Sequence, residues 1–278
     1  MEEGMQEEEV TVLSVSASKD AWLVAGAILL SGVIVAASIV WGGYFTKKAV
    51  VPTDTNTGAD TTQPKKDGEV TVTQDQVKAL FNDKNLAFGN KNSKVLFVEF
   101  SDPSCPYCNI AAGKNPNLNK QAGAQFTMPK DGGTYVPPVP EMKKLVDAGK
   151  AAFVWIYANG HGNGELATKA LYCAGEKKKF WEAHDLLMSE AGYKLLNETV
   201  KNDASKANVM AEFLKSAVPA NDMQACLTSG KYDSRLVDDM TVAKQFGFAG
   251  TPSFFVNTTH FGGAYSFKEM QSAVDGAK

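Results

Sequence analysis

The hydrophobic pattern divides the chain into an apolar run near the N-terminus, a polar stretch, and a long region of mixed helical and strand periodicity. Residues 21–45 contain no charged side chain and are apolar on every helical face. A helix of this length, at about 1.5 Å per residue, crosses a hydrocarbon core of about 30 Å. Trp22 and Trp41 lie near its ends, where membrane interfaces favour aromatic residues. The pattern predicts a transmembrane anchor over residues 21–45, preceded by an N-terminal tail over residues 1–20.

Two other interpretations of this apolar run fit less well. A cleaved signal peptide has a basic N-terminal region and a shorter apolar core, whereas residues 1–10 are acidic. A buried helix of a soluble protein is the second alternative, but this run is apolar all round and a polar stretch follows it. That stretch, residues 46–70, is rich in Thr, Asp, Lys and Pro, and it predicts a flexible linker.

The remaining residues, 71–278, have the pattern of one folded domain of the α/β class. Helices are predicted over residues 73–86, from residue 105, over 141–150, over several segments of 165–246, and over 266–278. Strands are predicted over residues 94–101, 151–160, 251–257 and 260–266, the last two as a hairpin. The order is βαβ, then helices, then ββα. It indicates a sheet domain with a helical insert over about residues 162–246.

Composition narrows the range of functions. The chain has 278 residues and a formal net charge of −3, so it lacks the basic surface of a nucleic-acid-binding protein. It has four cysteines, Cys105, Cys108, Cys173 and Cys226. This number permits one reactive dithiol and one structural disulfide, and a structural disulfide persists only in an oxidising compartment.

The motif Cys105-Pro106-Tyr107-Cys108 follows a buried strand and opens a helix. A cysteine at the start of a helix meets unpaired backbone N–H groups and the positive end of the helix dipole, and both favour its thiolate. The thiolate is the form that attacks disulfides. Pro106 suits the first helical position, where no N–H is needed. Cys105 is therefore predicted to be the exposed attacking sulfur and Cys108, one turn later, the buried resolving sulfur.

Two alternative interpretations of the motif remain open at this point. A zinc site would need a second pair of ligands, but Cys173 and Cys226 are far apart and the three histidines stand alone. The cysteines could also be inert core residues. The strand–CxxC–helix context favours the redox interpretation over both.

Two further features agree with redox chemistry. Glu99 lies within the apolar strand, six residues before Cys105, where burial would raise its pKa and let it exchange a proton with the buried sulfur. The alternative is a glutamate that faces solvent. Thr251-Pro252 precedes a late strand, and a cis bond there would present the Thr251 backbone to an extended peptide. An ordinary trans proline at the start of a strand is the alternative.

The segments FVEFSDPSCPYC and FGFAGTPSFFVN together resemble the DsbA-like branch of the thioredoxin fold. ALYCAGEKKKFWEAHDLL and MQACLTSGKYDSRLVDDMTVAKQFG resemble the helical insert of its membrane-tethered bacterial members. The resemblance covers roughly residue 95 to the C-terminus. It implies a thioredoxin-like fold with an inserted helical subdomain and a CPYC active site that includes Pro106 and Tyr107. It also implies a nucleophile at Cys105, a resolving Cys108, a buried proton acceptor at Glu99, and a cis Pro252 facing Cys105.

The sequence departs from this family in two ways. Residues 111–140 are longer than the usual link after the active-site helix, so we expect an added surface near the site. The threonine before Pro252 is more typical of isomerase and reductase relatives than of the strongest oxidases. Relatives that carry an equivalent cysteine pair have a structural disulfide, so the resemblance implies one between Cys173 and Cys226. The alternative is two separate buried thiols. Such a bridge could contribute about 4 kcal/mol in the chain-entropy model.

The resemblance implies a membrane-anchored bacterial enzyme whose catalytic domain lies outside the cytoplasm. Lysine counts, with Lys19 before the anchor and Lys47 and Lys48 after it, would favour the opposite orientation, but this rule is weak for long translocated domains. The expected substrates are reduced secreted proteins, with reoxidation by a membrane partner of the DsbB or vitamin K epoxide reductase type. We expect a redox-active disulfide, with no other cofactor and no metal. The alternative functions are those of a disulfide isomerase or reductase, or of a non-catalytic tethered chaperone or metal-binding module.

Overall fold

The computed structural model describes residues 70–277. The predicted tail (1–20), the predicted anchor (21–45) and all of the predicted linker except residue 70 therefore lie outside the described residues. Within residues 70–277, no helix combines the length and the apolar character needed to cross a bilayer.

Five strands form one mixed sheet in the order β1-β3-β2-β4-β5. The two central strands, β2 (Val95–Ser101) and β3 (Ala151–Tyr157), run parallel and are buried along their whole length. β4 (Ser253–Val256) pairs antiparallel with β2, while β1 (Leu86–Gly89) and β5 (Thr259–Gly262) form the edges. The continuous apolar runs of β2 and β3 are those expected of strands covered on both faces.

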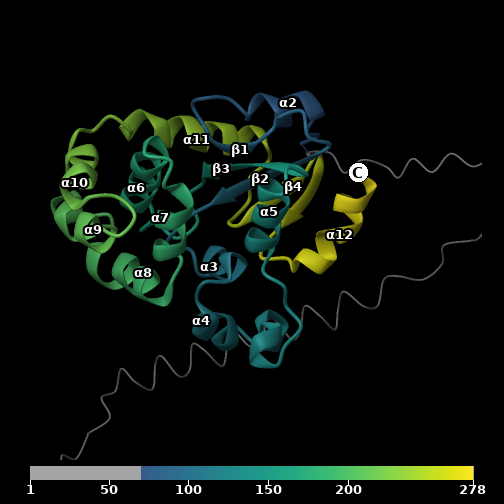
Figure 1. The fold of residues 1–278 in the computed structure, drawn as a ribbon, viewed down its shortest axis with the longest axis horizontal. Coiled ribbons are helices and arrows are strands. Elements are labelled where there is room, and N and C mark those ends of the chain that lie inside the picture. Colours follow the sequence, from purple (N-terminus) through teal and green to yellow (C-terminus); the bar gives the residue numbers. More distant parts are fainter. Residues whose placement is uncertain (1–69, 278) are drawn as a thin grey trace, which may run out of the picture. The chain divides into compact units, whose positions relative to one another are not determined.

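Helices cover both faces of the sheet (Figure 1). One face packs against α3 (Pro106–Ala112), α5 (Pro138–Asp147) and α12 (Phe267–Gly276). The other face packs against α2 (Gln74–Ala79) and α11 (Asp233–Gln245). Side chains alternate between the two faces along a strand. Phe97 belongs to the core beneath α3, so Glu99, two residues later, is directed to the same face.

The predicted helical insert is present between β3 and β4. Its elements before α11 are α6 (Glu165–Glu176), α7 (Phe180–Leu187), α8 (Glu190–Lys194), a π-helical segment (Leu195–Val200), a 3-10 turn (Ala204–Lys206), α9 (Ala207–Phe213) and α10 (Ala220–Thr228). A disulfide joins Cys173 of α6 to Cys226 of α10, with their Cα atoms 6.1 Å apart. This is the pairing that the family resemblance implies.

The predicted helix over residues 73–86 was too long, and strand β1 was missed. The helix ends at Ala79 because asparagine side chains bond to the last carbonyl groups. The Asn82 amide donates to the Ala79 carbonyl at 2.8 Å, and the Asn85 amide donates to the Leu80 carbonyl at 2.7 Å. The chain then turns, and Leu86–Gly89 pairs antiparallel with β3.

Residues 113–137 join α3 to α5 and are called the α3–α5 connection. It contains α4 (Pro116–Gln121) and two 3-10 turns (Ala124–Phe126 and Pro129–Asp131). The active-site helix ends at Ala112 because Gly113 adopts a φ of 66°, which glycine tolerates best. A Cβ atom there would lie 2.6 Å from the Pro137 Cγ, so the close return of the chain also requires glycine.

Candidate active site

Cys105 lies at the N-cap of α3, and Pro106 occupies the start of the helix. The residue is only 4% exposed, so the prediction of an exposed attacking sulfur was wrong: the Thr251 segment lies against this sulfur. A hydrogen bond from the Cys108 thiol is the largest cause that lowers the pKa of Cys105 to about 6. Burial opposes this, while the Thr251 side chain and the backbone N–H groups of Cys108 and Tyr107 add to it. The thiolate is therefore the main form of Cys105 at neutral pH.

Cys108 has the opposite character. It is fully buried, and its Sγ accepts a hydrogen bond from the Asp102 backbone N–H at 3.4 Å. Burial, followed by the neighbouring Cys105, raises the pKa of Cys108 well above its ordinary value. One sulfur is thus held as a thiolate and the other as a thiol, which are the roles predicted for an attacking and a resolving cysteine.

Glu99 is fully buried beneath α3, which excludes the solvent-facing alternative. Neither carboxyl oxygen has a hydrogen-bond partner within residues 70–277. Burial raises the pKa of Glu99 to about 8, an effect that Ser101 partly offsets. Ser101 also lowers the pKa of Cys108, so its hydroxyl lies near both groups. The carboxyl is therefore protonated at pH 7.

The raised pKa predicts how Glu99 changes stability with pH. Between an unfolded pKa of 4.5 and a folded pKa of about 8, the native state holds a proton that the unfolded state has lost. The contribution of Glu99 to the free energy of unfolding therefore falls as the pH rises from the unfolded pKa to the folded pKa. Glu99→Gln has no such proton to lose. We therefore expect the free energy of unfolding of the variant, minus that of the parent, to rise by about 3 kcal/mol from pH 5 to pH 7, since each pH unit contributes about 1.4 kcal/mol.

Urea unfolding of the reduced proteins at both pH values measures this difference. Glu198→Gln, a change from carboxylate to amide at an exposed position, is the matched control. A Glu99→Gln effect that is the same at pH 5 and pH 7 would contradict the raised pKa.

The peptide bond Thr251-Pro252 is cis and directly precedes β4. The Cys105 Sγ lies 3.5 Å from the Thr251 carbonyl oxygen, so the two segments, 146 residues apart in the chain, meet at the sulfur. The structure thus brings Cys105, Cys108, Thr251 and Pro252 together. Cys173 and Cys226 form a disulfide within the helical insert.

A buried carboxylate that the sequence analysis missed fixes the turn before Cys105. One oxygen of Asp102 accepts from the Ser104 N–H and hydroxyl, at 2.8 and 2.7 Å. The other accepts from the N–H groups of Gly160 and His161, at 3.0 and 2.9 Å. Asp102 therefore fastens the active-site turn to the loop after β3. An aspartate two residues before a serine is a typical turn signal and could have indicated the local half of this arrangement.

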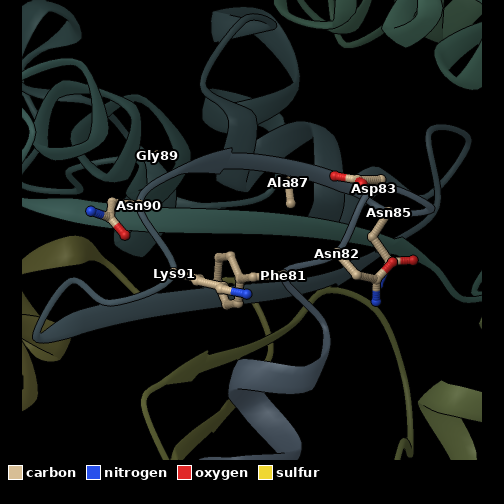
Figure 2. Close-up of a pocket in the computed structure, with 8 residues that line it drawn as sticks. All are labelled: Phe81, Asn82, Asp83, Asn85, Ala87, Gly89, Asn90 and Lys91. Carbon is tan, nitrogen blue, oxygen red and sulfur yellow. The ribbon is translucent and has the colours of Figure 1, made fainter.

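A polar hollow of about 650 Å³ lies beside β1, lined by residues such as Asn82, Asp83 and Lys91 (Figure 2). It contains none of the residues of the redox site. Within residues 70–277, no three His, Cys, Asp or Glu side chains lie close enough to form a metal site.

Residues 140–276 match the family model described as Thioredoxin. A Rickettsia felis protein described as "Putative protein-disulfide oxidoreductase" is 26% identical over 242 residues, covering 83% of this chain and 74% of that protein. The Na(+)/H(+) antiporter NhaA 1 of Salinispora arenicola is 24% identical over 198 residues, covering 70% of this chain. The chain spans only 25% of the length of that antiporter.

Solved structures share the fold. BdbD from Bacillus subtilis superposes with a TM-score of 0.51 at 18% identity, covering 70% of this chain and 92% of BdbD. Alpha-DsbA1 from Wolbachia pipientis gives 0.52 at 15% identity, covering 72% and 95%. These similarities confirm the thioredoxin-like α/β fold with a helical insertion. The Rickettsia relative and the family model agree with the resemblance to DsbA-like thiol:disulfide oxidoreductases that the motifs predict.

Proposed function

We propose that this chain is an extracytoplasmic oxidase that passes a Cys105–Cys108 disulfide to reduced cysteines of secreted proteins. The asymmetry of the two sulfurs carries this proposal. Cys105 lies at a helix N-cap with its pKa lowered to about 6, whereas Cys108 is fully buried with its pKa raised. Such a pair reacts through one sulfur and releases its partner through the other.

The reaction proceeds in two exchanges. A substrate thiolate attacks the Cys105 Sγ, the Cys105–Cys108 bond breaks, and Cys108 takes its electron pair. The protonated Glu99 carboxyl, buried beneath the same helix, is the proposed source of the proton that Cys108 takes up. A second substrate thiolate then attacks the substrate sulfur of the mixed disulfide, and Cys105 leaves as a thiolate. The substrate loses two electrons and gains a disulfide, while the enzyme gains two electrons and holds Cys105 as a thiolate and Cys108 as a thiol.

The low pKa of Cys105 favours the oxidising direction, because it stabilises the reduced enzyme and makes Cys105 a good leaving group. At pH 7, a pKa of about 6 stabilises the reduced form by about 1.4 kcal/mol, or about 30 mV for a two-electron couple. Thr251 precedes the cis Pro252. By the family resemblance, a threonine at this position favours an isomerase or reductase instead.

The reduction potential tests the direction. We expect a value more oxidising than the about −270 mV of thioredoxin. The potential should fall by about 59 mV per pH unit below pH 6, where reduction takes up two protons. Above pH 6 it should fall by about 30 mV per unit, because Cys105 then stays ionised. Equilibration with glutathione buffers between pH 4.5 and 7.5 measures both quantities, and a value close to that of thioredoxin would overturn the oxidase proposal.

The proposed location places residues 71–278 outside the cytoplasm, tethered through a linker over residues 46–70 to an anchor over residues 21–45. The Cys173–Cys226 disulfide supports it, because such bonds persist in oxidising compartments. Reoxidation of the dithiol requires an electron acceptor, and a membrane reoxidase of the DsbB or vitamin K epoxide reductase type is the proposed partner.

A further inference from the structure

Asparagine side chains hold the backbone carbonyl groups next to the attacking sulfur. The buried Asn109 amide of α3 donates to the carbonyl oxygens of Pro103 and Cys105, both at 3.0 Å. The Asn197 amide donates to the carbonyl oxygen of Ser104 at 3.1 Å. Three consecutive carbonyl groups of the active-site turn are therefore each bound to a side-chain amide.

The direction of these carbonyl groups matters for the Cys105 thiolate. The backbone N–H groups of Tyr107 and Cys108 bond to the sulfur and stabilise its negative charge. A carbonyl oxygen carries a partial negative charge, so an oxygen that turned towards the sulfur would oppose these N–H groups. An amide donor on each carbonyl fixes its direction and offsets part of its charge, which leaves the N–H groups to determine the field at the sulfur.

Asn197 belongs to the helical insert and not to the sheet. It lies in the π-helical segment Leu195–Val200, and π-helical turns are frequent at functional sites. Its NH₂ group also donates to the Tyr193 carbonyl at 3.1 Å, and its oxygen accepts from the Asn163 amide at 3.1 Å. The Asn163 N–H in turn donates to the Ser104 hydroxyl at 3.2 Å. These partners fix the orientation in which Asn197 presents its NH₂ group to the Ser104 carbonyl.

An apolar contact holds the insert against α3 close to these bonds. Met188, at the end of α7, is fully buried and packs in one cluster with Cys105, Cys108 and Ala112. Close-packed contacts of this kind resist displacement. The contact therefore keeps the insert, and with it the Asn197 amide, at a fixed distance from the active-site turn.

Building on the proposed function, we propose that Asn197 is a positioning residue through which the helical insert sets the reactivity of Cys105. It acts by fixing the Ser104 carbonyl group. Asn109 fixes the two flanking carbonyl groups from within α3. The sheet domain alone would leave the Ser104 carbonyl without its Asn197 donor, so the insert contributes to the chemistry of the site as well as to its shape.

A pH titration of the full-length protein in detergent tests this role. The ultraviolet absorbance of the thiolate, measured against the oxidised protein, reports Cys105, because Cys108 stays protonated and the other two cysteines are joined to each other. The parent should have its midpoint near pH 6. In Asn197→Ala we expect the midpoint to rise by about one half to one pH unit, since one hydrogen bond to the turn is lost. In Asn197→Asp it should rise further, because a carboxylate cannot donate to the carbonyl and adds a negative charge.

The matched control is Asn202→Gly, which loosens the same part of the insert. The Asn202 side chain bonds to the Gly162 carbonyl and the Leu166 N–H rather than to the active-site turn, and glycine suits its φ of 62°. We expect this variant to keep the midpoint of the parent. A shift as large as that of Asn197→Ala, or an unchanged midpoint in both Asn197 variants, would overturn the role of Asn197 alone. A parent in which Cys105 ionises near the ordinary cysteine pKa of about 8.5 would overturn the proposed function instead.

Discussion

A Cys105→Ser protein is expected to lose disulfide exchange completely, because no other sulfur in the site is both reachable and ionised. The Cys105 pKa of about 6 makes most of this sulfur a thiolate at pH 7. Cys108 cannot replace it, because it is fully buried and its raised pKa keeps it protonated. Oxidation of a reduced two-cysteine peptide, followed by mass spectrometry, measures the loss.

The matched variant Cys108→Ala should keep the attack and lose the release. Its Cys105 thiolate attacks the disulfide of an oxidised peptide, one peptide sulfur leaves as a thiolate, and a stable mixed disulfide accumulates because no resolving sulfur follows. Non-reducing electrophoresis detects this adduct. A Cys105→Ser protein that forms the same adduct through Cys108 would reverse the roles assigned here.

The features predicted correctly from the sequence depend on neighbours in the chain. The apolar runs of β2 and β3 report burial on both faces, and the position of Cys105 at a helix start follows from the strand before it and Pro106 after it. The burial of Glu99 follows from its place within an apolar strand. Each of these inferences needs only a window of about ten residues.

The missed features depend on contacts between distant segments or on very short elements. The carboxylate of Asp102 bonds Gly160, which is 58 residues away, and no local pattern records that pairing. The α3–α5 connection folds as α4 and two 3-10 turns, each too short to show a helical period. The sequence predicts an added surface near the site from residues 111–140, but not the hollow of about 490 Å³ next to Thr251, because its walls come from this connection and from the β5–α12 loop.

The Cys173–Cys226 disulfide supports the site through the helices that it joins. Tyr172, next to Cys173, donates its hydroxyl to the buried Asp239 carboxylate of α11 at 2.5 Å. The same carboxylate accepts the Tyr157 N–H at 2.9 Å, at the end of β3. The disulfide therefore stabilises α6, the helix that holds this contact between the insert and the central sheet.

Removal of this bond in Cys173→Ala/Cys226→Ala should lower the free energy of unfolding by about 4 kcal/mol, the chain-entropy value for a closed loop of this length. The two residues are 53 positions apart, so reduction frees a large part of the insert in the unfolded state. Urea unfolding at 25 °C measures the change, with Cys105→Ala/Cys108→Ala as the control that removes the other pair. A loss below about 1 kcal/mol would show that packing alone holds α6 against α10, since constraint of the unfolded chain predicts several times more.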